Sequence, residues 1–264
     1  MKNMIIILLL ISYNAKAQYN SGARLTAMAL TGVSLQDIWS ISSNQAGIVN
    51  ITKTAVAIGY ERPFADQELN SQSFLIVQPV QKGVLGIGLQ KYGFSEYQLL
   101  KAGFTVARKF GNDISAAINL NYHELKISGY GSAKAFTAEA GVQYQLNEKI
   151  RLGAHVSNPG NAGFGKNIAA DLPVALEFGA SWKFTTKVLL AGAITQFNNS
   201  SSEIKLGVEY LILDWLSLRG GFSAEPAKQY AGFGINFQNL RFDFAAGSNP
   251  VIGYSPQVAL GYEF

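Results

Sequence analysis

Apolar and polar residues alternate along most of this chain. The last eight residues, 257–264, place an aliphatic or aromatic side chain at every second position and end on Phe264. Successive side chains of a β-strand point to opposite faces, so such a segment presents one apolar and one polar face. The pattern predicts fourteen strands, over 52–62, 71–80, 83–92, 97–109, 113–127, 134–146, 150–158, 173–184, 187–197, 203–212, 215–224, 229–237, 240–248 and 256–264.

The apolar sides of these strands form long rows, several of which end on tyrosine or tryptophan. One row comprises Ile114, Ala116, Ile118, Leu120 and Tyr122. Aromatic rings that close an apolar row suit the headgroup layer of a membrane. A secreted β-sandwich would also alternate. The strand number, the terminal aromatic residue and the low charge favour an all-β fold, a transmembrane antiparallel up-and-down β-barrel, with twelve strands as the alternative count.

The connections between predicted strands alternate between tight turns and longer loops. The tight ones are 81–82, 110–113, 147–149, 185–186, 213–214 and 238–239, and the longer ones 64–70, 128–133, 158–172, 198–202 and 247–255. Short turns on one rim and longer loops on the other are typical of bacterial outer-membrane barrels. We therefore predict the cell outer membrane as the location. An even strand count places both termini on the periplasmic side.

The start of the chain departs from the alternating pattern. Residues 1–17 combine an early lysine, a short apolar run and an Ala-x-Ala site, which predicts a cleaved signal peptide. Residues 18–50 lack alternation and contain helix-compatible stretches, which predicts a short, partly helical plug in the lumen or a lead-in segment. The barrel itself is predicted over 51–264.

Composition excludes several classes of function. Charged residues make up 14% of the chain, against about 25% in ordinary soluble domains. No second run approaches the roughly 20 apolar residues of a transmembrane helix. The formal net charge is +4, but lysines and arginines do not cluster, so nucleic acid is not an expected partner. The absence of cysteine excludes disulfides and thiolate metal sites. No cofactor is expected.

The polar sides of the strands carry most of the charge, and this predicts a network of paired charges inside the lumen. Six cations and six anions nearly balance, which suits bracing of a narrow or plugged interior better than an ion-selective pore. The cations are Lys101, Arg151, Lys183, Lys205, Arg219 and Arg241, and the anions are Glu61, Glu139, Glu177, Glu209, Asp243 and Glu263.

Two short motifs suggest chemistry but have simpler explanations. The stretch 160–167 nearly spells a phosphate-binding loop, yet Asn167 replaces the required hydroxyl and no helix pattern follows. His155 and Ser157, followed by Asn158, match the His-x-Ser pair of outer-membrane phospholipases. The predicted facing puts both side chains in the lumen, away from phospholipid. A phospholipase is therefore a remote alternative, and no catalytic or metal-binding residue is predicted.

The N-terminal segment carries a pattern of small and polar residues at Gly22, Ala23, Arg24, Ala27, Met28, Gly32, Val33, Asp37, Asn44, Ala46, Gly47 and Ile48. In these residues it resembles the FadL-like outer-membrane barrels, most closely the PorV/PorQ-type proteins of Bacteroidota. The family pattern has a G-A-R start, A-M-G-G, an acidic residue and N-P-A-G-[LI] before the first strand. Gln45 stands where the pattern has proline, and Ala29 and Leu30 where it has glycines. A second match covers 153–160, 172–173 and 176–181.

This resemblance implies a fourteen-stranded barrel with an N-terminal lumen segment, and two kinds of function. FadL-like proteins move hydrophobic compounds, whereas PorV-type relatives serve the type IX secretion system. Short loops and a charge-lined lumen favour a non-enzymatic subunit of an envelope secretion or assembly machine, with outer-membrane lipid and other envelope proteins as partners. A FadL-like channel for hydrophobic small molecules is the alternative. Tyr262 and Phe264 are expected to act as a signal for barrel assembly.

Overall fold

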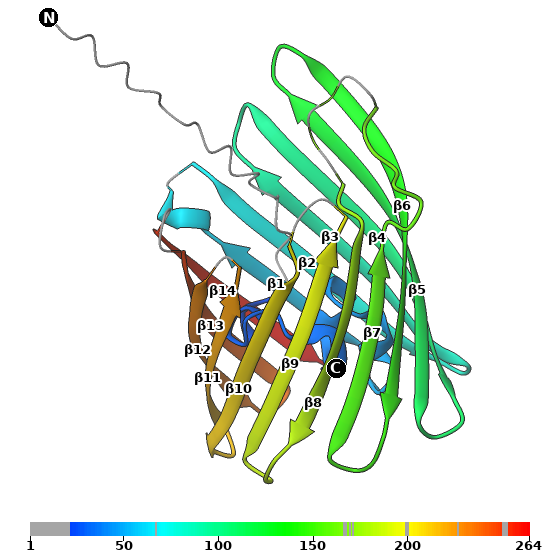
Figure 1. Cartoon of the computed structure of the whole chain (residues 1–264), viewed down its shortest axis with the longest axis vertical. Helices are drawn as coiled ribbons and strands as arrows, with labels where there is room; N and C mark the ends of the chain where they lie inside the picture. The colour runs from blue at the N-terminus through cyan, green and yellow to red at the C-terminus, as the bar shows by residue number, and fades with distance from the viewer. Residues whose placement is uncertain are drawn as a thin grey trace, which may run out of the picture.

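A computed structural model describes residues 22–66, 68–165, 168, 170, 172–198, 201–225, 227–249 and 253–264. The predicted signal peptide lies outside these residues, as do two positions of the near phosphate-binding motif, 166 and 167. Fourteen antiparallel strands close into a barrel around a short N-terminal segment (Figure 1). The predicted fold class and the count of fourteen strands are therefore confirmed.

Each strand pairs with its neighbours in sequence, and β1 pairs with β14 to close the barrel. The strands are β1 Ala55–Glu61, β2 Asn70–Val80, β3 Gly83–Gly93, β4 Tyr97–Phe110, β5 Ile114–Ile127, β6 Gly131–Gln145, β7 Ile150–Ser157, β8 Ala175–Lys183, β9 Val188–Phe197, β10 Glu203–Leu213, β11 Leu216–Ala224, β12 Lys228–Phe237, β13 Leu240–Asn249 and β14 Gly253–Glu263.

The closing seam joins the two ends of the barrel sequence. Ile58 lies opposite Leu260, and the backbone N–H of Phe264 donates to the carbonyl of Thr54 at 2.9 Å. Tyr262 packs edge-on against Phe264 with ring centroids 5.1 Å apart, and both rings point outward and are exposed. Closure leaves the sheet without a free edge at this seam, as a membrane-embedded sheet requires. The role of this aromatic end as an assembly signal stays a prediction.

The two rims of the barrel differ. We call the end with the connections 81–82, 111–113, 146–149, 184–187, 214–215 and 238–239 the turn rim, and the opposite end the loop rim. The C-terminus lies at the turn rim, where β14 ends. At the loop rim only the connections 62–69 and 158–174 are long, so the predicted contrast between the rims rests mainly on these two.

Strands β4, β5 and β6 project beyond their neighbours at the loop rim (Figure 1). They have 14, 14 and 15 residues, and β7 pairs with β6 only from Glu139 to Gln145. The sequence placed the start of β6 at 134, three residues late. Ser132 and Lys134 put polar groups on the outer side there, so the alternation fades where the strand leaves the apolar belt.

The N-terminal segment lies inside the barrel and is drawn in blue in Figure 1. It comprises α1 Ala23–Ala27 and three single-turn 3-10 helices, η1 Gly32–Ser34, η2 Ile38–Ser42 and η3 Gln45–Ile48. We call residues 22–50 the plug. Its apolar residues form one buried cluster with inward alanines and aliphatic residues of the wall. Within the described part of the chain, no helix is long and apolar enough to span a bilayer.

Candidate functional site

Glycines on the inner face of the wall allow the backbone of the plug to approach closely. A Cβ atom built on Gly153 would lie 2.1 Å from the carbonyl oxygen of Val33, and one on Gly207 would lie 2.6 Å from that of Met28. No side chain fits at such distances, so these positions seat η1 and the end of α1 against β7 and β10. The plug therefore occupies the middle of the lumen.

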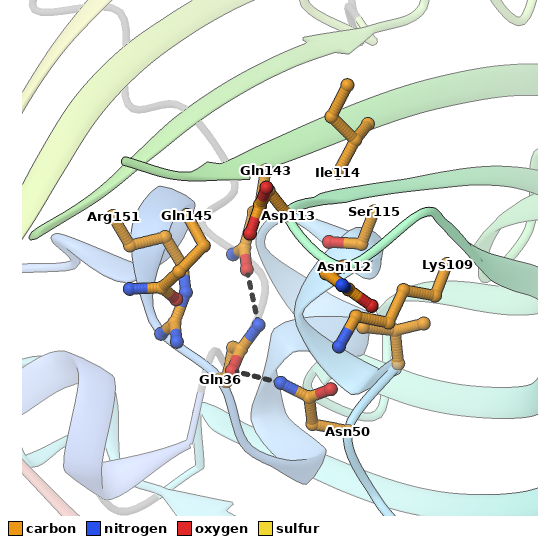
Figure 2. A pocket seen from close by; sticks show the side chains of 11 residues that line it. Gln36, Asn50, Lys109, Asn112, Asp113, Ile114, Ser115, Gln143, Gln145 and Arg151 are labelled. Carbon is orange, nitrogen blue, oxygen red and sulfur yellow. Dashed lines mark hydrogen bonds between the residues drawn. The ribbon is translucent and has the colours of Figure 1, made fainter. Parts of the chain in front are cut away.

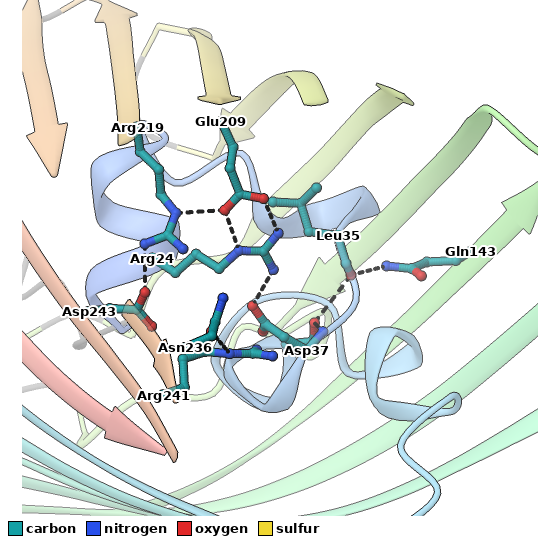
Figure 3. Close-up of polar contacts among 10 residues, drawn as sticks. Arg24, Leu35, Asp37, Gln143, Glu209, Arg219, Asn236, Arg241 and Asp243 are labelled. Atoms are coloured by element: carbon teal, nitrogen blue, oxygen red, sulfur yellow. Dashed lines mark hydrogen bonds and ion pairs between the residues drawn. The ribbon is translucent and has the colours of Figure 1, made fainter. Parts of the chain in front are cut away.

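A chain of five alternating charges anchors the plug to β10, β11 and β13 (Figure 3). Arg24 forms two parallel hydrogen bonds with the carboxylate of Glu209, both of 2.9 Å, and a third of 2.6 Å with Asp37. Arg219 bridges the carboxylates of Glu209 and Asp243 at 2.6 Å each. We call these five residues the arginine chain.

The arginine chain ties two parts of the plug to the wall. Arg24 lies in α1 and Asp37 directly precedes η2, so one guanidinium holds both elements at Glu209 of β10. The side chains of Arg219 and Asp243 are only 3% and 2% exposed. Guanidinium groups stay charged at any physiological pH. Because a charge left alone in such a place is costly, each member depends on its neighbours.

A second polar cluster surrounds the carboxylate of Glu139 on β6. Lys101 donates to it at 2.8 Å, Asn121 at 2.9 Å and Gln45 of the plug at 2.5 Å, and a ring nitrogen of His155 lies 3.4 Å away. We call these five residues the Glu139 cluster. It fixes η3 to β4, β5, β6 and β7 on the wall across from the arginine chain.

The predicted lumen charges divide between these clusters and other places. Lys101, Glu139, Glu209, Arg219 and Asp243 lie in the two clusters. The others have looser or no ion pairs: Lys205 lies 3.8 Å from Glu177 and 3.9 Å from Glu203, Arg241 donates to Asn236, Arg151 lines a cavity, Glu61 lies at the loop rim, and Lys183 and Glu263 are exposed at the turn rim.

Sequence reasoning did not assign any plug residue to the charge network. Arg24, Asp37 and Gln45 supply the contacts that make each cluster continuous. The available signal was Arg24 itself, because a single arginine in the mostly apolar stretch 22–30 needs an acidic partner elsewhere. Glu61 and Glu263 both belong to the strands of the closing seam. They lie at its opposite ends, since Glu61 faces Gln257 and Glu263 faces Ala55.

The projecting ends of β4, β5 and β6 carry an apolar inner face, which the β7–β8 connection covers. Phe164 and Leu172 of that connection pack there and are 8% and 6% exposed. We call this group the mouth cluster. Its buried members are Leu99, Leu125, Ala135, Phe164 and Leu172, flanked by the partly buried Tyr92, Tyr97, Ile127, Ala133, Ile168 and Ala170.

Asn158 holds this connection in place. Its backbone has a φ of 50°, in the left-handed region that ends β7. Its side-chain amide donates to the carbonyls of Ala162 at 2.9 Å and Leu172 at 2.7 Å, and its side-chain oxygen accepts from the N–H of Ala162 at 2.9 Å. The side chain is therefore engaged by the loop and does not orient His155. His155 and Ser157 point into the lumen, as the facing pattern predicted, which argues against a phospholipase.

Replacing Asn158 with alanine is expected to loosen the β7–β8 connection without disturbing the barrel. Two buried carbonyls and one N–H would lose their partner, at a cost of about 1–3 kcal/mol for the local closure of the loop. Limited proteolysis of the purified variant should therefore cut within 158–174 faster than in wild type. Asn161→Ala, at an exposed position of the same loop, is the matched control. Equal cleavage rates for both variants would contradict this role of Asn158.

Two small cavities lie beside the plug. A cavity of about 90 Å³ lies on the turn-rim side of η3, between the plug and strands β4 to β7 (Figure 2). Gln36 and Asn50 of the plug face Lys109 and Arg151 across it. A second cavity of about 10 Å³ lies between η2 and the Glu139 cluster, and Lys101 and Asn121 line it. Among the described residues, no group of three or more His, Asp or Glu side chains could hold a metal ion.

Comparison with solved structures identifies the fold. The chain matches the Ralstonia pickettii toluene transporter TbuX with a TM-score of 0.73 at 13% identity, covering 92% of this chain and 98% of that one. It matches the Pseudomonas putida toluene transporter TodX with a TM-score of 0.68 at 11% identity, over 91% and 96%. A Pseudomonas aeruginosa FadL homologue matches with a TM-score of 0.65 at 11% identity, over 92% and 98%. No protein-family model matches the sequence, and no curated protein matches it.

These neighbours correct the function that the sequence favoured. Two of them are toluene transporters and the third is a FadL homologue, so the expectation of a subunit of a type IX secretion-like machine is wrong. That expectation rested on short loops and a lumen of paired charges. Two features were missing from that reasoning. The β7–β8 connection covers an apolar cluster at the loop rim, and the paired charges hold the plug to the wall.

Proposed function

We propose that this protein is a channel for small hydrophobic molecules in the outer membrane, with its loop rim outside and both termini in the periplasm. The mouth cluster is the observation that carries the proposal. Its five buried side chains lie at an end of the barrel that also holds exposed polar loops, and they would accept an apolar solute from water when the β7–β8 connection moves aside. The fold shared with toluene transporters supports the same conclusion.

The route from the mouth cluster inward leads to polar groups. Below Leu99 and Leu125, the next inward positions of β4 and β5 are Lys101 and His123. An apolar solute gains nothing from these groups, so the mouth cluster would serve for capture, and the plug would control further passage. Passage then requires the plug to give way at η3, where the two cavities lie on either side.

The proposed activity is transport without catalysis. The His-x-Ser pair faces the lumen, and the solved structures that share the fold are described as transporters. The finer resemblance to PorV/PorQ-type proteins stays a prediction, and the N-terminal part of its sequence signature lies in the plug. Arg24 and Asp37, two residues of that signature, form an ion pair inside the plug, which explains why both are present.

Phe164→Asp is expected to reduce uptake of a monoaromatic hydrocarbon about tenfold. Placing a carboxylate in the mouth cluster removes the largest apolar side chain of the covering loop, and burial of one such ring is worth about 1.5–3 kcal/mol. The measurement is the initial rate of uptake of radiolabelled toluene by cells that lack their own barrels for hydrophobic solutes. The rate is normalised to the folded barrel in the outer membrane.

Tyr130→Asp is the control, because Tyr130 is an aromatic residue at the loop rim but lies 91% exposed outside the cluster. Cells that carry this variant should take up toluene at the wild-type rate. If wild-type cells take up toluene no faster than cells without the barrel, the proposed function fails. If the Phe164 variant matches wild type, the mouth cluster is not the entry site.

A further inference from the structure

The outer side of the projecting strands carries a group of exposed lysines. Lys91 on β3, Lys126 on β5 and Lys134 on β6 all point away from the lumen and are exposed, while Glu124 is half-buried between them. Among the described residues, none of the three lysines has an ion-pair partner within 4.0 Å. We call Lys91, Lys126 and Lys134 the lysine face.

The strand registers place Lys91 and Lys134 in one cross-strand row. Lys91 lies opposite Leu100, Leu100 opposite Glu124, and Glu124 opposite Lys134, so this row crosses four strands. With strands about 4.8 Å apart, its two end lysines are roughly 14 Å from one another along the row. Lys126 stands one outward position above Glu124. The lysine face is therefore wide enough to contact two separate anionic groups.

An aromatic and aliphatic belt lies directly below this row. One outward position lower, Tyr122 packs on Phe136 with ring centroids 5.4 Å apart, and Leu89 and Ala102 occupy the same height on β3 and β4. Aromatic rings at the end of an apolar belt mark the membrane interface. Two residues of strand rise about 7 Å along the strand, so the lysine face lies just beyond this belt.

Among the outward strand positions nearest the loop rim, lysines are concentrated on this side of the barrel. On the remaining described strands, the outward positions nearest the loop rim carry neutral residues, such as Gln72, Gln196, Ile204, Gln229 and Tyr254. A positive charge needed only for solubility would be spread around the rim. Three lysines on β3, β5 and β6 instead present a local positive surface to the neighbouring lipid headgroups.

We propose that the lysine face binds the phosphate groups of an anionic glycolipid in the outer leaflet of the membrane. The ammonium groups supply the complementary charge, and the belt of Leu89, Tyr122 and Phe136 packs against the acyl chains of the same molecule. Glu124 lies directly opposite Lys134 and would orient it, leaving a net positive surface for phosphate. This binding would hold one side of the barrel, next to the mouth cluster, in contact with a bound lipid.

The test uses the full mature barrel in detergent and bis-phosphorylated lipid A as the probe. The triple variant Lys91→Gln, Lys126→Gln, Lys134→Gln is expected to weaken lipid A binding about 100-fold, from three lost lysine–phosphate contacts at a headgroup surface. Native mass spectrometry of lipid adducts over a titration measures the change. Wild-type affinity should also fall as salt is raised, because exposed charge pairs are screened.

The matched control removes the same charge at the other rim. Lys82, Lys149 and Lys187 are exposed lysines of the turn rim, and their triple glutamine variant should bind lipid A as wild type does. Equal weakening of both triple variants would overturn the proposal, because net charge alone would then govern binding. Equal affinity for phosphatidylglycerol or for dephosphorylated lipid A would also overturn it. Both variants should retain toluene uptake, so this test and the test of transport fail independently.

Discussion

Arg24→Met is expected to cause the largest loss of stability of any single substitution in the plug. The substitution leaves the carboxylate of Asp37, 3% exposed, without its cation and removes both hydrogen bonds that Glu209 accepts from the plug. Removing one partner of a buried ion pair costs about 3–5 kcal/mol. The free energy of unfolding in lipid vesicles, followed by tryptophan fluorescence during urea titration, should fall by this amount.

The same substitution should release the plug while the barrel persists. Arg24 joins α1 and η2 to β10, so both elements lose their common anchor, whereas the strand hydrogen bonds are untouched. Ion conductance of the variant in a planar bilayer should therefore rise well above that of wild type. Adding Asp37→Asn should restore part of the lost stability, because a neutral amide is cheaper to bury than an unpaired carboxylate.

Arg108→Met provides the comparison for Arg24. Arg108 faces outward near the turn rim, with its guanidinium carbon 5.7 Å from the ring centre of Phe110, and it takes no part in the plug. Its loss should change the free energy of unfolding by less than about 1 kcal/mol and leave the conductance unchanged. If the Arg24 variant keeps the stability and conductance of wild type, the arginine chain does not hold the plug.

Gly153→Ala is expected to displace the plug by steric contact alone. The added methyl group would lie 2.1 Å from the carbonyl oxygen of Val33 and 3.0 Å from the N–H nitrogen of Ser34, and backbone atoms cannot move aside as a flexible side chain can. Overpacking of this kind costs typically about 1–3 kcal/mol. The expected results are faster proteolysis within residues 22–50 and a higher ion conductance. The β-strand content measured by circular dichroism should not change.

Gly220→Ala is the control for this substitution. Gly220 lies on β11, and a methyl group there would come no nearer than 3.8 Å to any other atom. Both variants add one methyl group to a strand glycine, so any shared loss reports strand propensity rather than contact with the plug. A Gly153 variant whose plug is as protected as that of the Gly220 variant would show that η1 can shift without cost.

The strands were predictable because the alternation of apolar and polar residues, with a period of two, is a local property of each segment. Each wall segment faces lipid on one side, so the rows ending on Tyr122, Tyr144 or Trp182 revealed both the strand and its facing. The boundaries failed where that contrast stops. The start of β6 beside Ser132 and Lys134, and the start of β8 at Ala175 after Pro173, lie beyond the apolar belt, where both faces of a strand meet polar surroundings.

The functional features were harder to predict because they depend on contacts between distant residues. Arg24 and Glu209 are separated by 185 positions, and no local pattern pairs them. Phe164 and Leu172 belong to a connection without periodicity, so nothing in the sequence placed them over Leu99 and Leu125. The sequence shows the charged residues but not their partners. A lumen lined by charges was therefore interpreted as evidence against a hydrophobic channel, and this interpretation was wrong.

The position of the plug in the sequence determines the order in which the barrel can be completed. The plug precedes β1, yet its anchors Glu209, Arg219 and Asp243 belong to β10, β11 and β13, near the other end of the chain. The plug is therefore exported before the strands that anchor it, and it can bind them only after β10, β11 and β13 have followed. Because β1 and β14 then seal the wall, the plug has to be inside before that seam forms. A barrel that closes without the plug would leave the carboxylate of Glu209 without the cation that Arg24 supplies.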